Sequence, residues 1–185
     1  MDKTALLVMD VQGGMVSRLP TAQTFIPLLS KTVAAARPFV KIIYATVSFR
    51  PGHPEIAPSN VIFSAALKSG AFVAGSPETV IDPSIAPQEG DILVEKKRVS
   101  AFAGSGLDVI LRGLGIETLV LTGISTGGVV LSTVCEAADK DFKLVILKDL
   151  CADPDQAVHN VLMENVFTKR GEVLGAEEWL EKLKA

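Results

Sequence analysis

Residues 105–139, SGLDVILRGLGIETLVLTGISTGGVVLSTVCEAAD, decide the fold. Apolar residues recur at helical spacing over Ser105–Leu114, a β-branched run follows at Thr118–Leu121, and a second helical pattern covers Thr126–Asp139. Gly115 fits the C-cap of the first helix, because glycine adopts a left-handed backbone without strain. Helix, buried strand and helix in succession are typical of the βαβ units of a parallel sheet.

The same alternation runs through the rest of the chain. We expect further strands at Thr4–Met9, Val40–Val47, Asp91–Glu95, Leu144–Leu147 and Glu172–Leu174, and further helices at Ala22–Arg37, Ala157–Val166 and Ala176–Lys184. The strands are apolar throughout, which indicates that helices cover both faces of the sheet. The sequence therefore predicts a three-layer α/β/α fold, Rossmann-like, with a six-stranded, mainly parallel sheet.

Length and composition limit the class of protein. One hydrophobic core can serve 185 residues, so we expect a single domain over residues 1–185. The net charge of -3 and the scattered lysines and arginines lack the basic patch that nucleic-acid binding requires. The N-terminal apolar run is too short to span a membrane, and two cysteines are too few for a secreted disulfide framework. We expect a cytoplasmic protein that binds neither membranes nor nucleic acid.

Residues 50–90 break the alternation of strands and helices. Prolines recur there, at Pro51, Pro54, Pro58, Pro77, Pro83 and Pro87. The segment should therefore be loop, apart from a short helix near Phe63–Lys68. Long ordered loops in compact domains are often functional, so we expect this one to shape a ligand pocket.

Residues capable of chemistry follow three of the predicted strands. Asp10 ends the first strand, Lys96 and Lys97 follow the third, and a glycine-rich segment follows the fourth. In open parallel sheets, ligands bind at the carboxyl ends of the strands. An acid at the end of a buried strand needs a partner, and an acid paired with a lysine can also move protons. An ordinary strand-end ion pair is the competing interpretation.

The glycine-rich segment Gly123–Gly128 opens the predicted helix at Thr126. Backbone N–H groups at a helix N-terminus can bind an oxyanion or a carboxylate. The glycine spacing matches neither a dinucleotide fingerprint nor a P-loop, so we expect no nucleotide cofactor. Alternatively, Gly127 and Gly128 are packing glycines, and Ser125 or Thr126 is a helix N-cap.

Several runs together resemble the isochorismatase-like, or cysteine hydrolase, superfamily: ALLVMDVQ (5–12), VEKKRVSAF (94–102), GLDVILRGLGIETLVLTGIST (106–126) and STVCEAADKDFKLVILKDLCAD (132–153). The match covers nearly the whole chain in the same order. The resemblance implies that Asp10 is the catalytic acid/base and Lys96 its partner. Lys96 is chosen over Lys97 because the family's lysine stands two residues before the arginine of R-x-S-A-F, here Arg98.

The resemblance also reveals a departure. In cysteine hydrolases the nucleophile lies seven positions beyond the threonine of T-G, and counting from Thr122 this chain has Val129 there. A thioester route is therefore not expected. The isochorismatase route, protonation of a vinyl ether followed by water attack, needs no protein nucleophile. Cys135 should face another side of its helix, and Cys151 should follow the fifth strand near the site; both are better interpreted as buried thiols.

A metal site has little support, because the only histidines are His53 and His159 and the Asp-x-His pattern of nicotinamidases is broken. We expect no metal and no other cofactor. From the long loop, Arg50 and His53 can hold a substrate carboxylate, the arginine by a bidentate fork. A solvated turn is the alternative interpretation for both residues.

These observations predict an isochorismatase-family hydrolase that acts on a small anionic metabolite by Asp/Lys acid–base chemistry without a cysteine nucleophile. The alternative is a catalytically silent small-molecule-binding member of the family. The candidate catalytic positions are Asp10, Lys96 and Val129, the last at the family's cysteine position. The candidate substrate contacts are Gln12, Arg50, Ser125, Thr126 and Gly128. Family members often assemble, so we expect a homo-oligomer.

Overall fold

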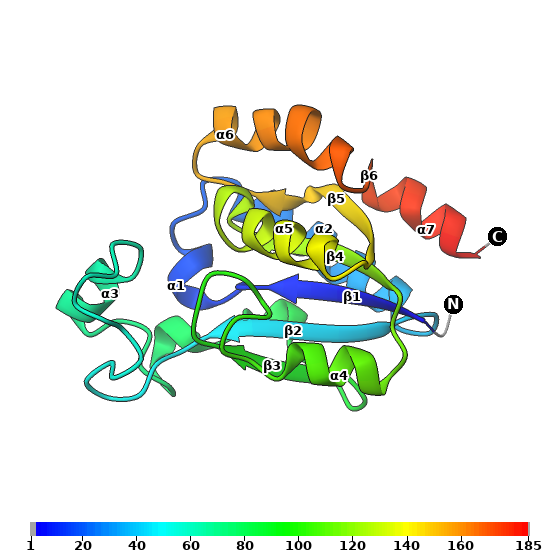
Figure 1. Ribbon diagram of the computed structural model, residues 1–185. Coiled ribbons are helices and arrows are strands. Elements are labelled where there is room, and N and C mark those ends of the chain that lie inside the picture. Colours follow the sequence, from blue (N-terminus) through cyan, green and yellow to red (C-terminus); the bar gives the residue numbers. More distant parts are fainter. Residues whose placement is uncertain (1–2, 185) are drawn as a thin grey trace.

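The computed structural model describes residues 3–184, which form three layers around a parallel sheet (Figure 1). Within these residues the strands are β1 (Thr4–Met9), β2 (Lys41–Val47), β3 (Ile92–Lys96), β4 (Thr118–Ile124), β5 (Lys143–Ala152) and β6 (Glu172–Leu174). Their order is β3-β2-β1-β4-β5-β6, and every neighbouring pair is parallel. The predicted fold class is confirmed, with a sheet that is wholly rather than mainly parallel over the described residues.

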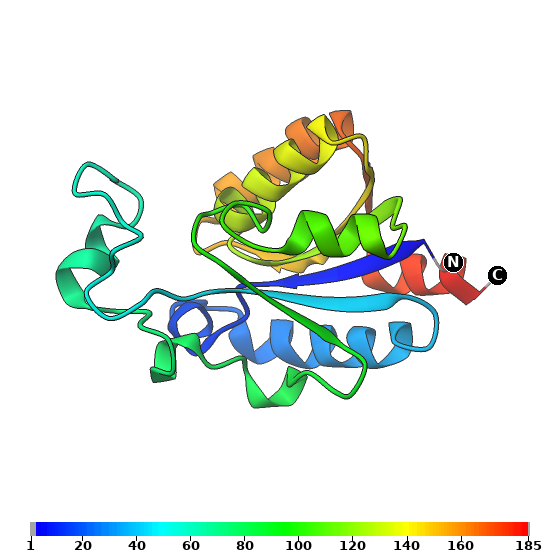
Figure 2. The ribbon, with the colours of Figure 1, turned by 60° about the horizontal axis from the view of Figure 1, so that its bottom comes forward.

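The helices cover both faces of this sheet (Figure 2). They are α1 (Gly13–Val16), α2 (Ala22–Ala36), α3 (Ser64–Ser69), α4 (Leu107–Gly113), α5 (Leu131–Asp139), α6 (Gln156–Val161) and α7 (Ala176–Lys184). Helices α2 and α7 pack on one face, and α4, α5 and α6 lie on the other. None of the helices in residues 3–184 has the length and apolar character needed to cross a membrane.

Two of the predicted helices are each divided into two parts. The helix expected over Thr126–Asp139 begins with a π-helical turn at Thr126–Val130 before α5 starts, and α6 continues into a similar turn at Leu162–Val166. Wide turns of this kind are frequent at functional sites, because they re-aim the residues that they contain. The first of them lies directly at the carboxyl end of β4.

Apolar residues on each face build a separate core. Leu107, Val130 and Val134 lie in the core beneath α4 and α5, whereas Phe25, Leu29 and Trp179 lie in the core beneath α2 and α7. Each fully buried side chain of this size stabilises the fold by about 1.5–3 kcal/mol. The two cores clamp the central strands β1 and β4 from both sides.

The carboxyl ends of β1 and β4 approach each other unusually closely. Gly123 has a φ of 148°, and a Cβ atom added to it would lie 2.3 Å from the carbonyl oxygen of Met9. The Thr122 hydroxyl donates to the carbonyl oxygen of Leu7 at 2.8 Å. After these strands the chain turns to opposite faces, towards α2 and towards α5. This switch point is where open α/β sheets bind ligands.

Strand β5 is longer than the sequence pattern indicates. It runs to Ala152 after a register shift against β4, so that Cys151 pairs with Gly123 inside the sheet. The expectation that Cys151 follows the strand, near the loops of the site, is therefore wrong. The apolar stretch Leu150–Ala152 is buried and continues the strand past Lys148 and Asp149, the polar interruption that made the pattern end early.

The irregular segment forms an arm, defined here as residues 50–76, that extends past the carboxyl ends of the strands (Figures 1 and 2). It contains α3, close to the predicted helix at Phe63–Lys68. The two ends of the arm are joined by hydrogen bonds of Phe49, whose N–H donates to Phe72 O and whose carbonyl accepts from Ala74 N–H. Val47, Phe49, Ile56 and Phe72 form a small apolar cluster that fixes the arm to β2.

Candidate active site

Asp10 and Lys96 form a buried ion pair at the carboxyl edge of the sheet. The Nζ atom of Lys96 lies 2.9 Å from Oδ2 of Asp10, and the two side chains are 1% and 5% exposed, respectively. Strand β2 lies between β1 and β3, so the long lysine side chain reaches across the end of β2 to meet the acid. Nζ also donates to the carbonyl oxygen of Arg98 at 2.9 Å, which fixes its direction.

The environment of Asp10 favours its protonated form. Burial raises the pKa of this carboxyl above its usual value, although the charge and hydrogen bond of Lys96 oppose that rise. The Oδ1 atom is buried and has no hydrogen-bond partner among the described residues. A buried polar atom without a partner is costly, so Oδ1 is available to a ligand or a substrate proton. A carboxyl group with a raised pKa is suited to act as a general acid near neutral pH.

The pair lines a cavity of about 250 Å³ that is otherwise largely apolar. Three aromatic rings form much of its wall: Phe49, which follows β2, and Phe63 and Phe72 in the arm. Of the predicted site residues, the structure brings together Asp10, Lys96, Ser125, Gly128 and Val129 in this lining. The arm thus shapes the pocket, as the interruption of the sequence pattern indicates.

The start of the active-site helix differs from the expected cradle of free N–H groups. The N–H of Gly127 donates to Oδ2 of Asp153 at 2.7 Å, and the N–H groups of Gly128 and Val130 each donate to the carbonyl oxygen of Ser125 at 3.2 Å. These three donors are therefore occupied within the protein. A Cβ atom on Gly128 would lie 2.7 Å from Oγ of Ser125, so a larger residue there would require the Ser125 side chain to rotate.

Gln12 does not line the cavity. Its side-chain nitrogen donates to the carbonyl oxygens of Val47 at 3.0 Å and Thr79 at 2.8 Å, and its side-chain oxygen accepts from the N–H of Val47 at 2.8 Å. The side chain is completely buried. Gln12 therefore ties β2 to the loop after the arm instead of lying where a substrate would contact it.

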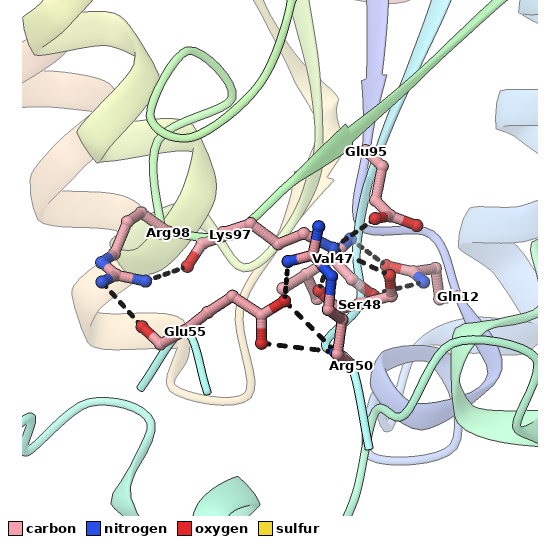
Figure 3. Close-up of polar contacts among 8 residues, drawn as sticks. All are labelled: Gln12, Val47, Ser48, Arg50, Glu55, Glu95, Lys97 and Arg98. Carbon is pink, nitrogen blue, oxygen red and sulfur yellow. Dashed lines mark hydrogen bonds and ion pairs between the residues drawn. The ribbon is translucent and has the colours of Figure 1, made fainter. Parts of the chain in front are cut away.

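Arg50 and His53 are also placed away from the cavity. The Arg50 side chain is 72% exposed and pairs with Oε1 of Glu55 at 2.7 Å (Figure 3). His53 is buried within the arm, where its Nε2 lies 2.7 Å from the carbonyl oxygen of Ala71. Glu55 is thus the hydrogen-bond partner of Arg50, and the carbonyl oxygen of Ala71 is the partner of His53. The solvated-turn alternative therefore fits the exposed Arg50, whereas His53 is buried.

Thr126 is fully buried and lies outside the cavity lining. Its Oγ1 is 2.9 Å from Nδ1 of His159, on α6. Burial lowers the pKa of His159, although the charge of Asp153 opposes this effect. The contact joins the start of the active-site helix to α6. Thr126 thus holds the position of the site rather than lining it.

A second set of polar and charged side chains lies where β2 and β3 lead into the loops. We call Ser48, Arg50, Glu55, Glu95, Lys97 and Arg98 the outer polar network (Figure 3). Lys97 pairs with Glu95 and donates to the carbonyl oxygen of Ser48 at 2.8 Å. The Arg98 guanidinium donates to the carbonyl oxygens of Lys97 at 2.6 Å and Glu55 at 2.9 Å. The network thereby attaches the arm to the end of β3.

The thiols lie apart from the pair. Cys151 is 4% exposed and donates to the carbonyl oxygen of Leu121 at 3.6 Å, and burial raises the pKa of its thiol far above the usual range. A nucleophilic cysteine needs the opposite shift. Neither Cys151 nor the half-buried Cys135 lines the cavity. Over residues 3–184, no three His, Cys, Asp or Glu side chains gather in a way that could hold a metal ion.

The sequence patterns did not identify Arg18 as a site residue, yet it lines the cavity from the segment after α1. Helix α1 has four residues and two glycines, so it produces no apolar periodicity that would place the next residue. The available signal was its position, eight residues after the strand-end Asp10.

The fold and the cavity define an α/β protein with an acid and a lysine paired at the switch point of its sheet. Comparison with known proteins agrees: the isochorismatase domain model matches residues 4–178, and the chain belongs to the isochorismatase family of hydrolases.

Individual relatives extend this comparison. The uncharacterized isochorismatase family protein YwoC of Bacillus subtilis is 33% identical over 98% of this chain and 95% of its own length. The ureidoacrylate amidohydrolase RutB of Variovorax paradoxus is 31% identical over 96% of this chain and 80% of its own length. The structure of an isochorismatase family protein from Burkholderia thailandensis superposes with a TM-score of 0.85 at 26% identity, covering 100% of this chain and 97% of the other.

Proposed function

We propose that this chain hydrolyses a small anionic metabolite through Asp10 and Lys96, without a cysteine nucleophile. The observation that carries the proposal is the desolvated pair at 2.9 Å, which lines a largely apolar cavity with one carboxyl oxygen uncommitted. Val129, at the family's cysteine position, offers only a buried isopropyl group to the same cavity. Chemistry at this site then depends on a proton donor rather than on a nucleophile from the protein.

In the proposed mechanism, the protonated Asp10 gives its proton to a vinyl ether carbon of the substrate. The substrate becomes an oxocarbenium ion, while the Lys96 ammonium group stabilises the carboxylate that forms. A water molecule adds to the cationic carbon, and Asp10 takes the proton that this water loses. The resulting hemiketal collapses with cleavage of its C–O bond, giving a ketone and an alcohol, so that one water is consumed and Asp10 is protonated again.

Amide hydrolysis through a thioester has less support. It needs an activated thiolate at the cavity and donors for the tetrahedral oxyanion. Here the family's cysteine position holds Val129, and the N–H groups of Gly127, Gly128 and Val130 donate to protein oxygens. The absence of a cysteine at position 129 also favours one alternative function: the protein binds a small molecule in this cavity without converting it.

Turnover measurements separate these possibilities. We expect the protein to hydrolyse isochorismate, as a vinyl ether substrate, and to leave ureidoacrylate and simple amides unchanged. Asp10→Asn should lower kcat by about 10²–10⁴-fold, the usual contribution of a positioned acid or base. Lys97→Met is the matched control, because Lys97 is adjacent in sequence but lies outside the cavity lining, and it should keep nearly full activity.

A cysteine-free variant tests the proposal that no cysteine takes part in the reaction. Cys135→Ala combined with Cys151→Ala should retain kcat, provided that circular dichroism shows an intact fold. Loss of turnover in this folded variant would contradict a cysteine-independent route. Ligand-induced stabilisation without consumption of any vinyl ether would instead support the silent binder.

A further inference from the structure

Arg18 differs from every other arginine in the described chain. The guanidinium groups of Arg37, Arg50, Arg98, Arg112 and Arg170 each donate to a carboxylate or a carbonyl oxygen. Over residues 3–184, the guanidinium of Arg18 has neither an ion-pair partner nor a hydrogen-bond acceptor, although it lines the cavity of the Asp10–Lys96 pair. An arginine side chain that is left unpaired at a cavity has its donors available for a ligand.

The charges around the cavity do not balance. Its lining contains three ionisable side chains, Asp10, Lys96 and Arg18. Asp10 compensates Lys96 while it is ionised, and Lys96 adds a second positive charge when Asp10 is protonated, so the cavity carries surplus positive charge in either state. A cavity with walls of low polarity and surplus positive charge favours an anionic ligand.

The backbone that carries Arg18 is held in place. The N–H of Arg18 donates to the carbonyl oxygen of Met15 at 3.1 Å, and the next residue, Leu19, is buried in the core beneath α2. Helix α1 also packs tightly on the arm, because a Cβ atom on Gly14 would lie 2.7 Å from the Phe72 ring. The backbone at Arg18 is thus fixed, and the exposed side chain extends from it to the cavity.

We infer that Arg18 is the specificity-determining residue of this site and binds a carboxylate of a small organic anion whose apolar part lies against the aromatic wall. The planar guanidinium matches a carboxylate through two parallel hydrogen bonds, which an ammonium group cannot reproduce. The role expected of Arg50 would then belong to Arg18. This inference rests on the proposed function, in which the same cavity presents the anion to Asp10.

The test measures binding, which does not depend on turnover. Isothermal titration compares benzoate with benzyl alcohol, a neutral molecule with the same ring. We expect benzoate to bind the wild-type protein more tightly, and Arg18→Met to weaken benzoate binding by roughly 10- to 100-fold while leaving benzyl alcohol unaffected. Arg18→Lys should restore part of the loss. Arg50→Met is the matched control, because it removes an exposed arginine that pairs outside the cavity, and it should bind like the wild type.

The outcomes are distinguishable from a failure of the proposed function. Equal affinity of the wild type for benzoate and benzyl alcohol, or an Arg18→Met variant that still binds benzoate like the wild type, would overturn the role of Arg18. Absence of benzoate binding would overturn it as well. Turnover that survives Asp10→Asn would overturn the acid–base mechanism and leave the Arg18 result standing.

Discussion

Lys96 and Lys97 are adjacent in the chain and belong to two different regions of the molecule. Lys96 ends β3 with its side chain 1% exposed and bound to Asp10, whereas the Lys97 side chain is 18% exposed and belongs to the outer polar network. Successive side chains of an extended chain point in opposite directions, so one lysine reaches the cavity and the other the surface. Both regions pair an acid with a lysine, and only burial distinguishes them.

This difference determines what each pair can do. Within the network, Lys97 holds the pKa of Glu95 below its usual value, so that acid stays ionised and inert at neutral pH. In the cavity, burial shifts the pKa of Asp10 upward, although Lys96 opposes this shift. Desolvation of two charges costs several kcal/mol per ion unless their pairing offsets it. The buried pair therefore carries a desolvation cost that the more exposed network largely avoids, and the network attaches the arm to the end of β3.

The largest effect is expected from removing the partner of the buried acid. Lys96→Met should lower the free energy of unfolding by about 3–5 kcal/mol, because it leaves Asp10 buried and unpaired. Chemical denaturation at neutral pH measures this loss. The double variant Asp10→Asn/Lys96→Met should be clearly more stable than Lys96→Met alone, since it buries no unpaired charge.

The pH dependence sharpens the same comparison. A carboxyl whose pKa is raised by folding destabilises the protein as pH rises above its unfolded value, 3.8 for Asp10, and has no effect when both states are protonated. The wild type shares this loss until Asp10 ionises in the folded state, so the deficit of Lys96→Met relative to the wild type should grow as pH rises above the folded pKa of Asp10 and fade below it. A deficit that stays constant with pH would mean that lost packing of the lysine stem, and not the charge of Asp10, causes it.

Features that depend on local sequence patterns could be predicted, whereas those that depend on contacts between distant residues could not. The bounds of β1, β6 and α7 agree with the expected ones, because each is a compact apolar or amphipathic pattern. Asp10 and Lys96 were also placed together, since strand-end residues of a parallel sheet meet at one edge and the family pattern selects that lysine. Local chemistry and topology were sufficient there.

Side-chain direction in the loops was not predictable in the same way. Gln12 is engaged by carbonyl groups 35 and 67 residues away, and no local pattern reports such partners. Arg50 is captured by Glu55, only five residues on, but the loop conformation that brings them together depends on the arm. Arg18 was missed because it follows a helix of only four residues, which produces no apolar periodicity.

An intermediate effect is expected where the two regions meet. The carbonyl oxygen of Arg98 accepts a hydrogen bond from Lys96, and the guanidinium of Arg98 donates to the carbonyl oxygen of Glu55 in the arm. Arg98→Ala should lower the free energy of unfolding by about 1–3 kcal/mol, the loss of charged hydrogen bonds, and reduce kcat by less than Lys96→Met does. Denaturation and steady-state kinetics measure the two effects.

Arg50→Ala is the control for Arg98, since its exposed pair with Glu55 lies in the same arm. It should change stability by less than about 1 kcal/mol. If Arg98→Ala affects neither kcat nor stability beyond that control, the buried pair is independent of the network. Arg98 would then not couple the Asp10–Lys96 pair to the outer polar network.

The smallest effect is expected within the network itself, from Lys97→Met. The hydrogen bond from Lys97 is the main cause of the lowered pKa of Glu95, so its stabilisation is present above the unfolded value of 4.5 and is lost as pH falls through the lower folded value. Because Glu95 is half exposed, the variant should lose less than about 1 kcal/mol at neutral pH, and less again in high salt. Denaturation curves at neutral and acidic pH should therefore separate from the wild type only in the neutral series. A loss as large as that of Lys96→Met, or one that persists in acid, would show that Lys97 contributes through packing and that burial alone does not distinguish the two lysines.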